Sequence, residues 1–150
     1  MMEFMIPKSL KLEHEELHAQ LVEATKAGGQ VAEAAKVVAK VLHPHFVKEE
    51  EYALPPLGLL PALAEGKVPP GMGDFLKMTS RLKADLGRML QEHKAIIAAL
   101  KNLADASKKE NQMSYVRFTE KLTQHVQTEE EVLYPAALLI GEYLRLKGGK

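Results

Sequence analysis

Cysteine and tryptophan are absent from this chain, and aromatic residues make up only 5% of its 150 residues. The lack of cysteine excludes disulfide bonds, cysteine-ligated iron–sulfur clusters and the usual structural zinc sites. Any metal that the chain binds must therefore be held by nitrogen and oxygen atoms.

The chain also lacks a charge excess and a long apolar run. Twenty basic and twenty acidic residues cancel, which argues against a broad electrostatic surface for nucleic acid or for an anionic membrane. Charges or prolines interrupt every apolar stretch before it reaches the length of a membrane span. The segment from Met1 to Leu10 has no basic region followed by an apolar stretch, so we expect no signal peptide and a cytoplasmic location.

The length and the abundance of Ala, Leu, Lys and Glu favour a single helical domain over residues 1–150. Four amphipathic helices are predicted, together with a connection at residues 54–73 that contains a short helical turn. The predicted helices cover 10–27 with Ser9 as N-cap, 30–53 interrupted by Pro44, 75–105 capped by Asp74, and 113–146 disturbed at Pro135. Two tight connections and one long one favour an all-α, up-down-up-down four-helix bundle.

Polar side chains of metal-ligating type interrupt the apolar stripe of every predicted helix. A buried carboxylate without a partner costs several kcal/mol or takes up a proton, and no Lys or Arg shares these stripes. Divalent cations would satisfy all of these groups, because neutral imidazole and carboxylate are natural ligands for iron, manganese and zinc. The interrupting residues are His14 and His18 on the first helix, His45 and Glu49 on the second, His93 on the third, and His125 and Glu129 on the fourth.

The histidines and glutamates repeat along the chain. A Glu-His pair is followed 31 or 32 residues later by His-x-x-x-Glu-Glu-Glu, and the two copies superpose at an offset of 79 or 80 residues. We therefore expect two helical hairpins of one design, related by a pseudo-twofold axis. Each hairpin would bring one lone histidine and one His/Glu pair to a shared centre.

These residues resemble the hemerythrin-like, or HHE cation-binding, family from about Leu10 to Leu139. The family pattern has His on the first helix, His-x-x-x-Glu on the second, His-x-x-x-His on the third and His-x-x-x-x-Asp on the fourth. The resemblance implies a four-helix bundle that holds two iron ions, bridged by carboxylates and by an oxo or hydroxo species. The implied ligands are His14, His45, Glu49, His93, His125 and Glu129, with Glu49 and Glu129 as bridges.

The chain departs from the family pattern at two places. Ile97 stands four residues after His93, where an oxygen carrier of the family has a second histidine. On the fourth helix Glu129 and Glu130 compete for the last carboxylate position, and we favour Glu129 because it mirrors Glu49 in the repeat. The incomplete histidine set argues against reversible oxygen carriage and favours a sensing or protective use.

Two further histidines and the identity of the metal stay open. His18 lies one turn from His14 and is a possible additional ligand, whereas His43 is expected at the surface or behind the ligands. Iron rests on the family resemblance, and manganese and zinc remain alternatives because they share these ligand types.

We predict a non-haem di-iron protein that binds or senses oxygen, nitric oxide, peroxide, or iron and redox state, with a non-enzymatic use favoured. Its partner would be a small diatomic or peroxide ligand at the metals. One alternative is a metal-free helical bundle used for protein interaction. Another is a ferritin-like oxidase or peroxidase, which needs Glu-x-x-His on two helices, whereas only Glu15-x-x-His18 matches here.

Overall fold

The computed structural model describes residues 6–148, and every regular element within that range is helical, as the sequence predicts. The domain expected over residues 1–150 therefore extends beyond the described residues at both ends. No helix between residues 6 and 148 combines the length and the apolar character needed to cross a membrane. The elements are α1 (Lys8–Thr25), α2 (Gly29–Lys48), a π-helical turn (Glu49–Ala53), a 3₁₀ turn (Pro55–Leu59), α3 (Leu60–Ala64), α4 (Gly73–Lys109), α5 (Met113–Thr128), a second π-helical turn (Glu129–Leu133) and α6 (Tyr134–Gly148).

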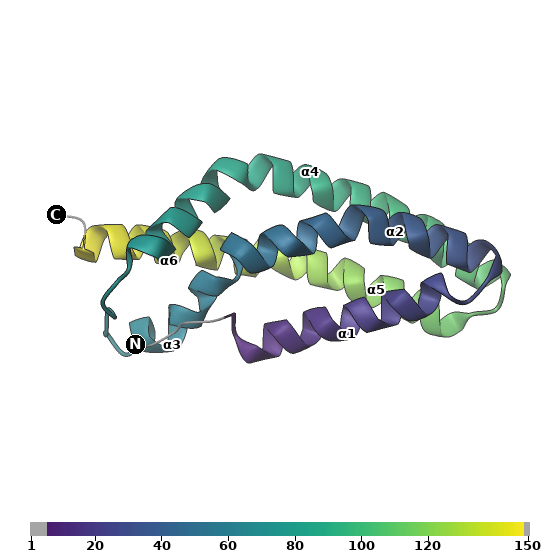
Figure 1. Ribbon diagram of the computed structural model, residues 1–150, viewed down its shortest axis with the longest axis horizontal. Helices are drawn as coiled ribbons and strands as arrows, with labels where there is room; N and C mark the ends of the chain where they lie inside the picture. The colour runs from purple at the N-terminus through teal and green to yellow at the C-terminus, as the bar shows by residue number, and fades with distance from the viewer. Residues whose placement is uncertain (1–5, 149–150) are drawn as a thin grey trace.

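The long helices lie side by side as a bundle (Figure 1). Helix α2 packs against α1 and α4, α4 packs against α5 and α6, and α1 packs against α5. The short connections at residues 26–28 and 110–112 lie at one end of the bundle, and the link from α3 to α4 lies at the other. Helices α1, α2 and α5 thus each pack against two others and the long α4 packs against three, so their buried stripes face a common interior.

Two helix starts differ from the sequence prediction. Ser9 lies inside α1 and Asp74 lies in the first turn of α4, and neither side chain caps its helix. Helix α1 follows Pro7, whose carbonyl oxygen accepts hydrogen bonds from two backbone N–H groups of the first turn. Proline has a fixed φ that suits a helix start, so the backbone begins the helix without a side-chain cap. Asp74 instead places its negative charge at the positive end of the α4 dipole.

Two π-helical turns, one after α2 and one after α5, each begin with a glutamate of the buried stripe. The Leu54 N–H donates to the Glu49 carbonyl oxygen at 2.8 Å, and the Tyr134 N–H donates to the Glu129 carbonyl oxygen in the same i to i−5 pattern. A proline follows each donor directly, and a proline removes the regular helical hydrogen bond and crowds the preceding turn. Widening the turn relieves that crowding. The two prolines are Pro55 and Pro135.

The predicted disturbance at Pro135 is therefore the second π-helical turn, which ends just before it. Pro44, by contrast, lies inside α2, and the helix continues through it to Lys48. Neither proline ends a long helix.

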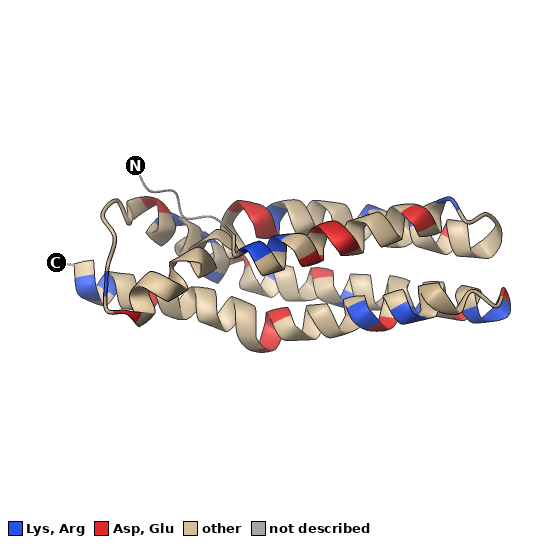
Figure 2. Cartoon of the chain, turned by 90° about the horizontal axis from the view of Figure 1, so that it is seen from below, with Lys and Arg blue, Asp and Glu red and all other residues tan. Residues whose placement is uncertain are grey.

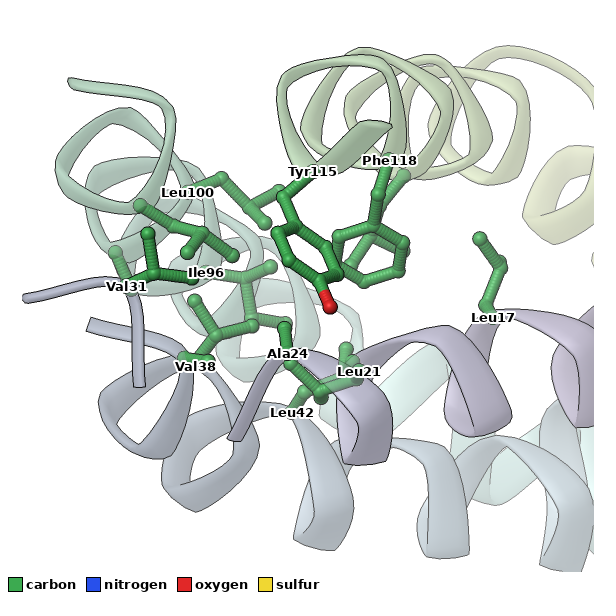
Figure 3. Packing of buried hydrophobic residues seen from close by; sticks show 14 of the residues in the cluster. Leu17, Leu21, Ala24, Val31, Val38, Leu42, Ile96, Leu100, Tyr115 and Phe118 are labelled. Carbon is green, nitrogen blue, oxygen red and sulfur yellow. The ribbon is translucent and has the colours of Figure 1, made fainter. Parts of the chain in front are cut away.

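The apolar core consists of two clusters with the polar stripe residues between them. The first cluster, part of which Figure 3 shows, lies toward the end with the short connections. The second cluster lies toward the other end and contains both Tyr52 and Tyr134. On α4, for example, Ile96 belongs to the first cluster and Met89 to the second, and His93 stands between them. The polar layer is thus closed from both ends by hydrocarbon.

Acidic and basic residues are interspersed along the lengths of the helices (Figure 2). This distribution agrees with the balance of twenty acidic and twenty basic residues.

Candidate metal centre

Four histidines and two glutamates meet in the polar layer between the two apolar clusters. Each of them is at most 5% exposed, although all six carry groups that water would otherwise solvate. They come from α1, α2, α4, α5 and both π-helical turns. The six residues are His14, His45, Glu49, His93, His125 and Glu129.

The six residues form two groups of four that share both glutamates. His14 and His125 make up one group with Glu49 and Glu129, and His45 and His93 make up the other with the same two carboxylates. Within each group, one nitrogen or oxygen atom of every residue lies within 4.8 Å of the others. The two carboxylates therefore stand between two positions that are each lined by two imidazoles.

All four imidazoles turn Nε2 toward this centre and Nδ1 toward a glutamate outside it. A neutral imidazole that donates from Nδ1 carries its lone pair on Nε2, so these outer contacts direct four lone pairs inward. The outer contacts are His14 Nδ1 to Glu50 at 3.1 Å, His45 Nδ1 to Glu92 at 2.7 Å, His93 Nδ1 to Glu130 at 2.7 Å, and His125 Nδ1 to Glu13.

The outer glutamates explain two features of the sequence repeat. Glu13 and Glu92 each precede a buried histidine in the chain, but each one contacts the histidine of a different helix. Glu50 and Glu130 are the second members of the two Glu-Glu-Glu runs, and they also reach across to another helix. The repeated Glu-His pair is the sequence signal that marks Glu13 and Glu92, but their partners lie 112 and 47 residues away.

When each imidazole donates outward from Nδ1, the inward-facing atoms of the four histidines and two glutamates are all hydrogen-bond acceptors, and this favours a bound cation. His14 Nε2 lies 3.2 Å from His125 Nε2, and both atoms carry lone pairs when Nδ1 donates outward. Glu49 Oε1 is buried and accepts no hydrogen bond, with His14 Nε2 at 3.4 Å. Among residues 6–148, no Lys or Arg forms an ion pair with Glu49 or Glu129. Nitrogen and oxygen donors of this kind fit a pair of divalent cations.

The electrostatics of the layer also favour positive charge. Burial and the neighbouring charge of Glu129 raise the pKa of Glu49 to about 7. Burial opposes the charged form of His125, but the hydrogen bond to Glu129 and the charges of both glutamates outweigh it and raise its pKa to about 9. The pKa values of His14 and His45 are raised in the same way, against burial, by the same two glutamates. Protons or metal ions therefore compete for the same groups.

The chain matches the model of the hemerythrin HHE cation-binding domain over residues 5–137. It belongs to the hemerythrin HHE family. The matched range includes both groups of four residues, and so the family relationship and the buried donor set point to the same part of the molecule. The comparisons with curated proteins and with solved structures gave no match.

One residue at the centre of this HHE domain was missed by the sequence analysis. The Tyr134 hydroxyl donates to Glu49 and lies 3.2 Å from His45 Nε2 and 3.3 Å from His93 Nε2. Burial and the charges of Glu49 and Glu129 raise the pKa of Tyr134 above its usual range. Leu54 holds the same position after the first π-helical turn, so the repeat gives no hint of a tyrosine here.

The remaining predicted residues lie outside the two groups. Glu130 contacts the outer nitrogen of His93, on the side away from the centre. His18 is exposed and lies beside His43, with 6.4 Å between their ring centroids. Ile97, which replaces a histidine of the HHE pattern, packs against the first apolar cluster.

Proposed function

We propose that this HHE domain holds two iron ions in the polar layer, bridged by an oxo or hydroxo species as well as by protein carboxylates. His14 and His125 would hold one ion, His45 and His93 the other, and Glu49 and Glu129 would bridge them. The observation that carries the proposal is that two groups of buried donors share both carboxylates. A carboxylate has two oxygen atoms, so one carboxylate can serve two metals at once. Iron is proposed from the family, and manganese or zinc would use the same donors.

The same repeat supports the proposed architecture. We infer an up-down-up-down bundle of two hairpins related by a pseudo-twofold axis, in one domain over residues 1–150. In its support, each hairpin supplies one lone histidine, one His/Glu pair, one π-helical turn and two outer glutamates. Two copies of one hairpin would give two equivalent metal positions, and Tyr134 then makes these positions unequal.

A bound pair of iron ions supplies the ability to bind or reduce oxygen, nitric oxide or peroxide. The residues of the chain determine how that pair is held. The four outer glutamates orient the imidazoles and make their Nε2 atoms stronger metal ligands. The apolar clusters exclude water from the layer, which strengthens every electrostatic interaction within it. Tyr134 presents a hydroxyl to the His45 and His93 side alone. We therefore propose that the protein binds or senses such a small ligand, or senses iron and redox state.

The ferritin-like alternative gains no support from the geometry. The sequence match on which it depends, Glu15-x-x-His18, lies on the outer surface of α1, and both side chains are exposed. Neither residue belongs to the two buried groups. A protein-interaction bundle without metal remains the outcome to test against.

The decisive measurement is the metal content of the full chain after anaerobic reconstitution with Fe²⁺ and removal of loosely bound ions. We expect two irons per chain, and near-ultraviolet absorption of an oxo-bridged pair that develops on exposure to air and disappears on reduction. A chain that retains no metal would overturn the proposal, because its buried groups would then be balanced by protons alone.

Single substitutions test the proposed ligands. His45→Gln and Glu49→Gln each remove one donor from the polar layer and should lower the iron content. His43→Gln, two residues before the first of these on the exposed side of α2, is the matched control and should leave the final iron content unchanged. Equal iron content in all three variants would contradict the residue assignment.

A further inference from the structure

A cavity on the surface of the molecule leads to one of the buried histidines. It lies between α1 and α2, has a volume of about 250 Å³, and reaches His14. Its other lining residues are Glu15, His18, His43, Phe46, Val47 and Glu50. His14 is only 2% exposed and turns Nε2 to the metal centre, so its imidazole ring alone separates this end of the cavity from the centre.

Two exposed histidines flank this cavity. His18 comes from α1 and His43 from α2, and their ring centroids are 6.4 Å apart. With metal–nitrogen bonds of about 2.1 Å, two imidazoles on one tetrahedral ion have centroids roughly 5 Å apart. Both side chains are exposed and free to change rotamer, so binding one ion requires only that the two rings move closer together. Both histidines also line a neighbouring, mostly apolar cavity of about 160 Å³.

Between this histidine pair and the metal centre, two side chains both line the cavity and contact His14. Glu50 is 43% exposed, lines the cavity and contacts His14 Nδ1 at 3.1 Å. Phe46 also lines the cavity and stacks on the His14 ring, with 4.0 Å between centroids and 7° between planes. The Glu50 carboxylate and the His14 imidazole therefore provide two further cation ligands between the exposed histidines and the metal centre.

The second hairpin carries a matching cavity with the opposite electrostatic character. It has a volume of about 280 Å³ and reaches His93 and its outer partner Glu130. At the repeat offset of 79 residues, Lys94 replaces Glu15 and Ile97 replaces His18, and Lys101 adds a second positive charge. The two lysines repel an approaching cation, so this second cavity is the less favourable place for a cation to enter. Among the described residues, both openings thus reach a buried histidine and its outer glutamate, but the one over His14 adds two exposed histidines and a glutamate where the other adds two lysines.

We propose that metal ions enter the centre through the cavity over His14, and that His18 and His43 form a transient binding site for a divalent cation at its mouth. This inference rests on the proposed function, because it supplies the entry route to that metal pair. It also gives a role to His18 and His43, which the metal centre does not use. The pair binds an ion weakly and keeps it near Glu50 and His14, which raises the rate of uptake without adding a permanent site.

The first test is the rate of Co²⁺ uptake by the metal-free full chain, followed by visible absorption in a stopped-flow instrument. His18→Gln with His43→Gln should lower the second-order rate constant about tenfold, the lower end of the effect that a raised local ion concentration has on association rates. The final content of two metals per chain should not change. Lys94→Gln with Lys101→Gln is the matched control at the other opening and should not slow uptake. Equal rates for wild type and the histidine double variant would overturn the proposal.

The second test detects the transient site directly. Zn²⁺ is added to the wild-type chain beyond two equivalents while the imidazole ring signals are followed by NMR. The signals of His18 and His43 should shift together, and unshifted signals would overturn the proposed site. This readout is independent of the metal centre. If the chain holds no metal pair, the proposed function fails and the entry role fails with it. If the pair forms and these two signals do not move, only the entry site fails.

Discussion

The Tyr134 hydroxyl donates a hydrogen bond to the Glu49 carboxylate, across 85 residues of sequence. Tyr134 begins α6 directly after the second π-helical turn, and Leu54 holds the corresponding position after the first. The two halves of the repeat therefore differ at their centre. A hydroxyl faces the His45 side, whereas the equivalent position in the first half carries an apolar side chain.

Tyr134→Phe should lower the free energy of unfolding of the metal-free protein by about 1–3 kcal/mol, because a buried carboxylate loses its donor. Urea denaturation at pH 7 measures the change. Tyr115→Phe is a suitable control, since its hydroxyl lies 3.4 Å from Glu23 and makes a weak hydrogen bond. Equal stability of Tyr134→Phe and wild type would show that the contact with Glu49 contributes nothing.

The second Glu-Glu-Glu run gives a graded series of variants within three adjacent residues. Glu129 is buried between the two histidine groups, Glu130 contacts His93 Nδ1 at 2.7 Å, and Glu131 is exposed. Glu129→Gln should abolish the metal pair. Glu130→Gln should weaken metal binding by about 10–100-fold, because an outer carboxylate orients the imidazole and strengthens it as a donor. Glu131→Gln should have no effect.

Competition with a chromophoric chelator measures all three affinities under one set of conditions. The order of the effects matters more than their size. A larger loss for Glu130→Gln than for Glu129→Gln would assign the bridging role to Glu130, which is the alternative that the family pattern offers.

The stability of the metal-free protein should fall as the pH rises from 6.5 to 9. The pKa of His125 is about 9 in the folded chain and 6.5 in the reference state, so its protonation stabilises the fold fully below pH 6.5. That contribution is lost as the pH rises through 9. The pKa values of His14 and His45 are shifted in the same direction. Bound metal replaces these protons, so the metal-loaded protein should lack this loss.

Thermal unfolding followed by circular dichroism between pH 6 and 9, with and without metal, tests this difference. His125→Gln should flatten the pH dependence of the metal-free protein, because it removes a histidine whose pKa is raised to about 9. An unfolding temperature of the metal-free wild type that rises over this range would contradict the assignment.

Helical periodicity predicted which histidines and glutamates of the metal centre are buried, because the face on which a residue lies depends only on its spacing along the helix. Residues four apart share a helix face, and the stripe of the helix predicted over residues 30–53 placed both His45 and Glu49 inside, where the structure has them. The repeat then selected two such stripes as equivalent. These features belong to single helices, and so the sequence was sufficient for them.

Helical periodicity does not predict which side chains of different helices contact each other. Glu50 and Glu51 are neighbours in one acidic run, yet the first contacts His14 and the second pairs with Arg81 on another helix. Both are exposed, and only the relative rotation of the helices separates their roles. Tyr134 was missed for a similar reason, because a π-helical turn shifts every later residue around the helix axis relative to a regular α-helix.

A close contact between α4 and α6 provides a test of the packing that is separate from the metal centre. A Cβ added to Gly141 would lie 2.6 Å from the Cβ of Thr79, so no larger residue fits there without movement of a helix. Gly141→Ala should therefore lower the free energy of unfolding by about 1–3 kcal/mol through overpacking. Gly87→Ala is the matched control, because Gly87 is exposed on α4 and nothing lies within 4 Å of its added Cβ. That variant should gain about 0.5–1 kcal/mol, since alanine is the better helix former. Urea denaturation of both variants decides the matter, and a Gly141→Ala chain as stable as the Gly87→Ala chain would show that α4 and α6 do not approach this closely.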